Sequence, residues 1–150
     1  MRVVIQRVSD AKLDIENTSY ASIGQGLLVL LGVGEEDTLE DADYICKKTL
    51  SLRIFSDSDG KMNLSIQDIM GQLLLVSQFT LFADTKKGNR PSYIAAARPD
   101  KAIPIYEYCV SQLMKVLGDR LKTGVFGADM KINLTNDGPV TIIIDSKDIK

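Results

Sequence analysis

The most hydrophobic run of the chain is LLLVSQFTLF at residues 73–82, and it constrains the fold most. It is much shorter than the roughly 20 apolar residues that a helix needs to cross a bilayer, so it has to be buried within the protein. Its Leu, Val and Phe content predicts a strand over 73–82. Ser77, Gln78 and Thr80 interrupt the run. Polar side chains in so apolar a segment need hydrogen-bond partners or a ligand.

The hydroxyl groups in this run first suggest a nucleophile, which usually needs a base, most often His. The chain contains no His, which argues against a Ser-His-Asp hydrolase. In a regular strand, Gln78 and Thr80 share one face, and Ser77 and Phe79 share the other. The simpler alternative is a strand end at which these groups cap the sheet or reach water.

Length and composition predict a single domain over residues 1–150, because 150 residues with 45% hydrophobic and 25% charged side chains are typical of one globular core. No repeat or linker divides the chain. The start, MRVVIQRVSD, is typical of a strand and not of a signal peptide. We therefore expect a cytoplasmic protein without a membrane segment. The polar end, residues 146–150, is expected to be a frayed tail.

Metal, cofactor and extended nucleic-acid sites are not expected. Cys46 and Cys109 lie in helical patterns outside any CxxC pair, which indicates buried, reduced thiols. Without His, a zinc site would need an unusual carboxylate-rich ligand set. The DSDG stretch at 57–60 fits a turn, because an EF-hand register would put Phe55 and Ile66 at ligand positions. A net charge of −2 disfavours contact with long nucleic acid.

Helical periodicity appears twice. The first helix is predicted to begin at Thr38, with Asp41 completing a capping box, and its apolar stripe comprises Leu39, Ala42, Cys46, Thr49 and Leu50. The second is predicted to be capped by Asp100, to hold Pro104 in its first turn and to end at Gly118. Its buried face comprises Ile103, Tyr106, Cys109, Val110, Leu113 and Leu117.

The remaining segments indicate strands. We expect strands at 3–8, 27–33 and 53–56, a hairpin turn near Glu16–Thr18, and a C-terminal hairpin of 130–134 and 140–144. Strands and helices do not alternate strictly. The pattern therefore predicts an α+β fold in which a mostly antiparallel or mixed sheet curls into a barrel with two main helices.

Two polar segments leave alternatives open. Lys86, Lys87 and Arg90 surround Gly88 in KKGNRPS, which lacks the P-loop spacing; the loop either holds phosphates or is a solvated surface. In NDGPVT at 136–141, Asp-Gly predicts a hairpin turn. The following proline is either cis, which is usually a placed feature in a tight turn, or an ordinary proline at the start of an edge strand.

Taken together, SQFTL, KGNRPS and FGADMKINLTNDGPVT resemble the D-aminoacyl-tRNA deacylase family, also called D-tyrosyl-tRNA deacylases. The resemblance extends through RVVIQRVSDA, GLLVLLGV and LRIFSDSDGKMNLS, and is weaker in the hairpin LDIENTSYAS. SQFTL and N-x-G-P-[VT] are the family's two motifs. Each is weak alone, and the pair in this order and spacing is specific.

The resemblance implies a cytosolic homodimer that hydrolyses the ester between a D-amino acid and tRNA. The active site would lie at the dimer interface, with SQFTL from one subunit and the Gly-Pro turn from the other. A cis Gly138–Pro139 unit, in a substrate-binding segment that includes Asn136, would crowd the side chain of an L-residue while a D-residue or glycine fits. Arg7 would brace this turn.

The resemblance also implies how the ester is cleaved. Ser77, Gln78, Phe79 and Thr80 would form the catalytic segment, with backbone N–H groups around Phe79 and Thr80 holding the carbonyl oxygen. A ribose hydroxyl of the tRNA would assist attack by water, with Thr80 positioning substrate or, alternatively, acting as nucleophile. The tRNA end would meet basic residues of the polar loop, namely Lys86, Lys87 and Arg90. A non-catalytic dimeric module that binds a ligand or an RNA end, and a purely structural domain, are the alternatives.

Overall fold

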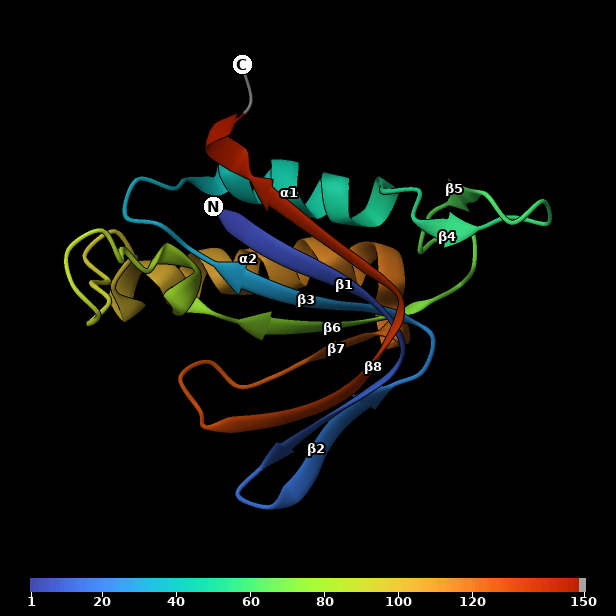
Figure 1. The fold of residues 1–150 in the computed structure, drawn as a ribbon, viewed down its shortest axis with the longest axis horizontal. Helices are drawn as coiled ribbons and strands as arrows, with labels where there is room; N and C mark the ends of the chain where they lie inside the picture. Colours follow the sequence, from blue (N-terminus) through green and yellow to red (C-terminus); the bar gives the residue numbers. More distant parts are fainter. Residues whose placement is uncertain (149–150) are drawn as a thin grey trace.

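The structure is a computed structural model that describes residues 1–148. Its main sheet has six strands in the order β2-β1-β3-β6-β7, with β8 paired to β1, and it curls strongly around one part of the core (Figure 1). The strands are β1 (Arg2–Ile15), β2 (Thr18–Ile23), β3 (Gly26–Gly32), β4 (Phe55–Ser56), β5 (Met62–Leu64), β6 (Gln72–Ser77), β7 (Leu121–Thr123) and β8 (Met130–Asp145). The helices are α1 (Leu39–Ser51), α2 (Pro99–Leu117) and the 3₁₀ turns η1 (Phe79–Phe82), η2 (Gly118–Arg120) and η3 (Ser146–Asp148).

The sheet is mixed, which confirms the predicted α+β class. β1 is antiparallel to β2, β3 and β8, whereas β3, β6 and β7 run parallel. Parallel strands are normally covered on both faces and are therefore apolar throughout. This explains why 27–31 and 73–76 are continuous hydrophobic runs.

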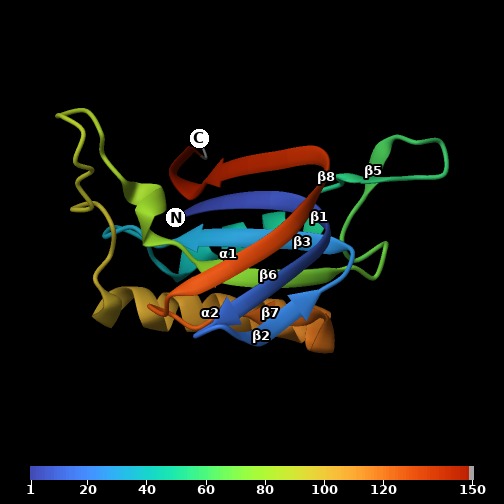
Figure 2. The same ribbon diagram turned by 60° about the horizontal axis from the view of Figure 1, so that its bottom comes forward.

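Alternate residues of these central strands point to opposite faces of the sheet and pack into two separate hydrophobic cores. Leu73 and Leu75 pack on the side of α1 and α2, whereas Leu74 and Val76 fill the interior of the curled sheet. Figure 2 shows both helices on one face of the sheet. Ser77 continues the alternation, so its side chain lies on the helix side.

The start of α1 follows the prediction with one exception. Thr38 is the N-cap, and its N–H donates to Asp41 Oδ2 at 2.8 Å in a capping box. Ala42, Cys46, Thr49 and Leu50 are buried, but Leu39 is 49% exposed, which corrects its assignment to the buried stripe. Leu39 occupies the first helical position at the edge of the stripe, away from the centre of the helix-sheet contact.

Two predictions for α2 are wrong. The N-cap is Arg98, and Asp100 lies within the first turn, because Pro99 with its fixed φ favours the first helical position. Pro104 lies deeper in the helix than its first turn. The predicted buried face is correct for Tyr106 and, on the same stripe, for Cys109, Leu113 and Leu117, whereas Ile103 and Val110 are half-buried.

Three predicted strands differ from the observed ones. β6 ends at Ser77, and 79–82 form η1 instead of continuing the strand. The predicted C-terminal hairpin is one long strand, β8, which pairs with β1 over almost its whole length. The predicted strand at 53–56 is reduced to Phe55–Ser56. The turn between β1 and β2 is confirmed, with Glu16 and Asn17 both at positive φ.

The expected frayed tail does not begin at Ser146. The Ser146 N–H donates to Met1 O at 2.8 Å, and its hydroxyl donates to Asp41 Oδ1 at 2.6 Å. The Met1 ammonium group donates to Asp37 Oδ1 at 2.6 Å. Buried polar partners therefore hold η3, and residues 149–150 lie outside the described part. No helix within residues 1–148 is both long and apolar enough to cross a membrane.

Candidate functional site

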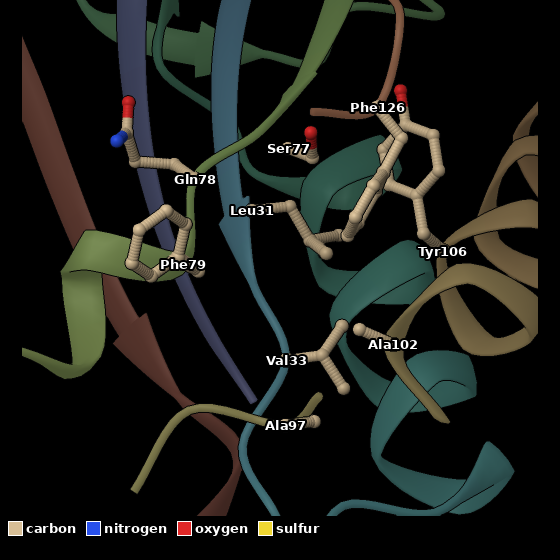
Figure 3. Close-up of a pocket in the computed structure, with 9 residues that line it drawn as sticks. All are labelled: Leu31, Val33, Ser77, Gln78, Phe79, Ala97, Ala102, Tyr106 and Phe126. Atoms are coloured by element: carbon tan, nitrogen blue, oxygen red, sulfur yellow. The ribbon is translucent and has the colours of Figure 1, made fainter. Parts of the chain in front are cut away.

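The polar residues of SQFTL lie where β6 ends, beside its parallel neighbour β3. The Gln78 N–H donates to Leu31 O at 2.7 Å, which is the last bond of the β3–β6 ladder. Beyond it the chain turns into η1. Figure 3 shows Ser77 on the side of Phe126 and Tyr106, with Gln78 directed away from them. The regular-strand alternation over 77–80 is therefore wrong, because the strand stops at Ser77.

The side chains of Gln78 and Thr80 contact each other. Gln78 Nε2 donates to Thr80 Oγ1 at 2.5 Å. This bond uses a lone pair of the threonine oxygen and leaves the hydroxyl hydrogen free to donate. The arrangement favours Thr80 as a hydrogen-bond donor over Thr80 as a nucleophile, since no basic group is paired with its hydroxyl among the bonds of the described residues.

The first two N–H groups of η1 belong to Phe79 and Thr80. The N–H groups that open a helix have no partner within it, and the backbone bonds of η1 begin with Leu81 N to Gln78 O and Ala83 N to Thr80 O. Phe79 is 54% exposed, and its ring meets Tyr93 edge-on with centroids 5.2 Å apart. Two such donors beside an apolar ring can receive a polarised carbonyl oxygen.

Two adjoining pockets meet at this strand end. The smaller, about 10 Å³, lies beneath the segment and is lined by Leu31, Val33, Ser77, Gln78, Phe79, Ala97, Ala102, Tyr106 and Phe126 (Figure 3). The larger, about 290 Å³, is open and lined by Ser77, Gln78, Phe79 and residues 126–130. Only the second has room for a substrate group. Reasoning on single residues missed 126–130, although FGADM belongs to the segment that carries the family resemblance.

Tyr106 forms the back wall of the smaller pocket. Its hydroxyl donates to Leu75 O at 3.3 Å, and its ring meets Phe126 edge-on at 5.9 Å. Burial raises the pKa of Tyr106 to about 12, so the phenol stays protonated at neutral pH. Tyr106 therefore links α2 to the end of β6.

The second predicted motif lies in a bulge of β8. Gln6 faces Thr141 and Val8 faces Asn136, so 137–140 project from the ladder opposite Arg7. The Gly138–Pro139 peptide bond is cis. Gly138 has φ +131°, and an added Cβ would lie 3.0 Å from an Arg7 nitrogen and 2.9 Å from Val140. Only glycine fits here without displacement.

Arg7 contacts this bulge as predicted from the resemblance. Its Nε donates to Asp137 O at 2.9 Å, and Nη1 donates to Ile54 O at 2.7 Å. The Asp137 carboxylate lies 3.6 Å from Nε. The guanidinium thus links the bulge to the segment after α1. Asn136 is exposed at the edge of the same bulge.

The two motifs lie far apart within one chain. η1 and the bend of β8 lie at opposite ends of the central strands in both views (Figures 1 and 2). Arg2 contacts Leu81 in η1, and Arg7 is five residues further along β1, about 17 Å at 3.3–3.4 Å per residue. One chain does not bring SQFTL and Gly138–Pro139 together.

The three predicted basic residues are exposed in the loop between η1 and α2: Lys86, Lys87 and Arg90. The loop is closed by paired bonds between Asp84 and Ser92, and it extends from the η1 end of the molecule (Figure 1). Among residues 1–148 no ion pair involves these three cations.

The cysteines are free and buried, as predicted. Cys46 Sγ donates to Cys109 O at 3.8 Å. The contact with Cys46, together with burial, raises the pKa of the Cys109 thiol, so this thiol is a poor nucleophile. Within the described residues no three His, Cys, Asp or Glu side chains gather in a way that could hold a metal ion.

Comparisons with known proteins agree with the motifs. The family described as D-Tyr-tRNA(Tyr) deacylase matches residues 4–145. Relatives named D-aminoacyl-tRNA deacylase from Flavobacterium johnsoniae and Bacteroides thetaiotaomicron are 57% and 54% identical over 147 residues, covering 98% of this chain and 98% of theirs.

Solved structures agree as well. One titled "c-Myc DNA Unwinding Element Binding Protein" matches with a TM-score of 0.92 at 38% identity, covering 97% of this chain and 98% of its own. Another, titled as a probable eukaryotic D-amino acid tRNA deacylase, matches in fold with a TM-score of 0.83 at 18% identity, over 95% of this chain and 97% of its own. This chain belongs to the D-Tyr-tRNA(Tyr) deacylase family.

Proposed function

We propose that this chain hydrolyses the ester bond of D-aminoacyl-tRNA, releasing the D-amino acid and tRNA, and rejects the L-aminoacyl ester. The observation that carries the proposal is the open pocket at the end of β6, which is lined by Ser77, Gln78 and Phe79 and lies beside the N–H groups that open η1. Family membership supplies the substrate class. Selection against an L side chain would also admit a glycyl ester, because glycine has no side chain.

The chemistry needs no strong nucleophile, because the scissile bond is an activated ester. Water attacks the carbonyl carbon, and the N–H groups of Phe79 and Thr80 stabilise the negative charge on the carbonyl oxygen. The carbon–oxygen bond to the ribose then breaks, and the proton lost by the water goes to the departing ribose oxygen. The neighbouring ribose hydroxyl assists this transfer, and the Thr80 hydroxyl, oriented by Gln78, positions the substrate.

Chiral selection requires a second copy of the chain. The Gly138–Pro139 bulge is exposed and lies in the middle of β8, between the pairs that Asn136 and Thr141 make with β1. The segment 138–145 of β8 has the bulge at its start and, at Asp145, the Arg2 contact that leads to η1. A twofold axis through the middle of this segment exchanges its two ends between the copies, so each bulge lies near the partner's η1. The bulge at Gly138–Pro139 then meets the substrate α-carbon and excludes an L side chain.

The surface along this axis suits a partner copy. Ile143 is 73% exposed on β8, which is an edge strand with one unpaired side. A hollow of about 480 Å³ beside it is lined by Arg2, Val3, Val4, Leu81, Ile143, Asp145 and Asp148. Long edge strands that carry exposed apolar residues are typical sites of association. We therefore propose a homodimer.

The tRNA is bound mainly through its 3′ end. Lys86, Lys87 and Arg90 are exposed cations in the loop that follows η1, without ion-pair partners among the described residues. A few such cations are sufficient for a short phosphate segment, which is compatible with a net charge of −2. We place this activity in the cytoplasm, where the substrate is made.

The test compares hydrolysis of D-tyrosyl-tRNA with that of L-tyrosyl-tRNA by purified protein at neutral pH, with EDTA in a parallel sample. We expect the D-ester alone to be hydrolysed at a rate that EDTA does not change. Equal hydrolysis of both esters, or of neither, contradicts the proposal and favours a module that binds an RNA end without catalysis.

Thr80→Val separates catalysis from binding. The valine keeps the side-chain shape and removes the hydroxyl, so we expect kcat to fall about 10-fold or more while binding of tRNA is retained. Thr80→Ser, which keeps the hydroxyl, is the matched control. Full activity of Thr80→Val would show that the Thr80 hydroxyl has no role in hydrolysis.

A further inference from the structure

Arg2 connects η1 to the end of β8 through three contacts. Its Nη1 donates to Leu81 O at 3.1 Å, and its Nε donates to Asp145 Oδ2 at 2.7 Å. Its guanidinium carbon lies 4.6 Å from the centroid of the Phe82 ring. One planar cation thus contacts a carbonyl, a carboxylate and an aromatic face, a combination that arginine makes and lysine does not.

The Phe82 ring also packs against β3 and the residues that follow it. A Cβ added to Gly32 would lie 3.2 Å from Phe82 Cδ2, and one added to Gly34 would lie 2.8 Å from Phe82 Cε1. The ring therefore packs closely against glycine backbone, with Arg2 as its other neighbour. A side chain at either glycine would displace the ring and, with it, the end of η1.

η1 needs such support because it is short. It has four residues, and 3₁₀ turns of this length have poor hydrogen-bond geometry and little stability of their own. Its first end follows the Gln78 N–H bond to Leu31 O. Its last turn is held by the Arg2 bond to Leu81 O and by the packed Phe82 ring. The direction of its first N–H groups therefore depends on both ends.

Asp145 holds the guanidinium in place. Its Oδ2 accepts from Arg2 Nε, and its Oδ1 accepts from the Lys147 N–H at 2.9 Å. Burial raises the pKa of Asp145, but the bonds from Arg2 and the Lys147 N–H lower it more, so that the net shift is downward. The carboxylate therefore stays charged at neutral pH, and the pair remains intact.

We propose that Arg2 is a positioning residue for ester hydrolysis, which holds η1 so that the Phe79 and Thr80 N–H groups face the substrate carbonyl. It does not touch the substrate, and it acts through Leu81 and Phe82. This inference rests on the proposed function and adds to it a residue outside both family motifs. Losing this support moves the oxyanion donors, and misplacement of about 1 Å can lower a rate about 100-fold.

The test is Arg2→Met, which keeps much of the apolar stem. Arg120→Met is the matched control, because Arg120 Nη1 donates to Gly71 O, also at 3.1 Å, just before the opposite end of β6. We expect Arg2→Met to lower kcat for D-tyrosyl-tRNA about 10- to 100-fold, with KM changed less than about 3-fold. We expect Arg120→Met to keep the wild-type kcat. Selectivity against the L-ester should persist in both variants.

Urea unfolding establishes that each variant is folded, and an unfolded Arg2→Met is replaced by Arg2→Lys. Lysine keeps the charge but cannot bond Leu81 O and Asp145 in the same geometry, so a reduced kcat is again expected. Added ethylguanidinium should partly restore kcat in Arg2→Ala and should not change Arg120→Ala. A wild-type kcat in a folded Arg2 variant, or an equal loss in Arg120→Met, overturns the proposal. Failure of the wild-type protein to hydrolyse the D-ester contradicts the proposed function itself.

Discussion

At the scale of single residues, the shape of the β8 bulge depends on Gly138 having no side chain. Gly138 has φ +131°, a conformation that residues with a side chain rarely adopt, and it lies against Arg7 and Val140. Two costs therefore add for any substitution: backbone strain and a steric clash. Arg7 Nε donates to Asp137 O in the same bulge, so a displaced bulge also loses this hydrogen bond.

Gly138→Ala is expected to lower the free energy of unfolding by about 3 kcal/mol and to reduce the preference for the D-ester, because the added methyl group displaces the bulge. Urea unfolding and paired D- and L-tyrosyl-tRNA assays measure the two effects. Gly60→Ala is the control: Gly60 has φ +76° but no atom within 4 Å of an added Cβ. It should cost about 1 kcal/mol and leave selectivity unchanged. Equal effects of the two substitutions would refute the steric argument.

At the scale of secondary-structure elements, α2 contains a proline in its interior that costs the helix a hydrogen bond. Pro104 lies inside the helix and is exposed. A proline within a helix lacks the N–H that would bond to the carbonyl four residues earlier, here that of Asp100. The helix tolerates it because its opposite face is buried against the core through Tyr106 and Cys109.

Pro104→Ala is therefore expected to raise the free energy of unfolding by about 1–2 kcal/mol, the gain in helix propensity less the entropy that proline removes from the unfolded chain. Pro99→Ala is the matched control, since Pro99 opens the helix and sacrifices no hydrogen bond. It should change stability by less than about 0.5 kcal/mol. Urea unfolding of both variants tests the difference, and a destabilised Pro104→Ala would count against it.

At the scale of the whole molecule, the proposed site couples activity to assembly, because it needs residues from two copies of the chain. Ile143 is exposed on the edge strand β8. The two halves of the proposed site, η1 and the bend of β8, lie at opposite ends of the central strands (Figure 2). Ile143→Lys is expected to convert a dimer to a monomer in analytical ultracentrifugation and to abolish hydrolysis of the D-ester, with little change in the free energy of unfolding of the monomer. Met62→Lys, another exposed apolar residue on β5, should leave both unchanged. A fully active monomer would exclude a site shared between copies.

The network around Asp41, which links both ends of the chain, makes stability depend on pH in the acid range. Burial raises the pKa of Asp41, but bonds from Lys147, the Ser146 hydroxyl and the Thr38 N–H lower it more, to below its usual value of 3.8. A depressed folded pKa stabilises the protein above the unfolded pKa, and this contribution is lost as the pH falls through the folded value. Urea unfolding should therefore show stability decreasing below about pH 4. Asp41→Asn should be less stable at pH 7 and depend less on pH in this range; an unchanged slope would contradict the assignment.

Much of the molecule follows from local sequence. The capping box of Thr38 and Asp41, the turn at Glu16–Asn17 and the glycine that ends α2 each depend on residues a few positions apart, and all were predicted correctly. The apolar runs of β3 and β6 identified the buried strands. The two motifs identified the family, which the comparisons confirm, whereas the roles of the individual site residues stay predictions.

Only the tertiary structure decided where β6 ends and where β8 continues. β6 stops where its last ladder bond, Gln78 N–H to Leu31 O, is made, because a strand extends only as far as its neighbour offers partners. β8 passes through Asp-Gly without reversing, since β1 supplies partners on both sides of the bulge. The sequence by itself determined the two main helices, the buried central strands and the family, through local spacing and composition. The strand ends, the η1 turn and the separation of the two motifs depend on pairing between distant segments, and no local pattern encodes that pairing.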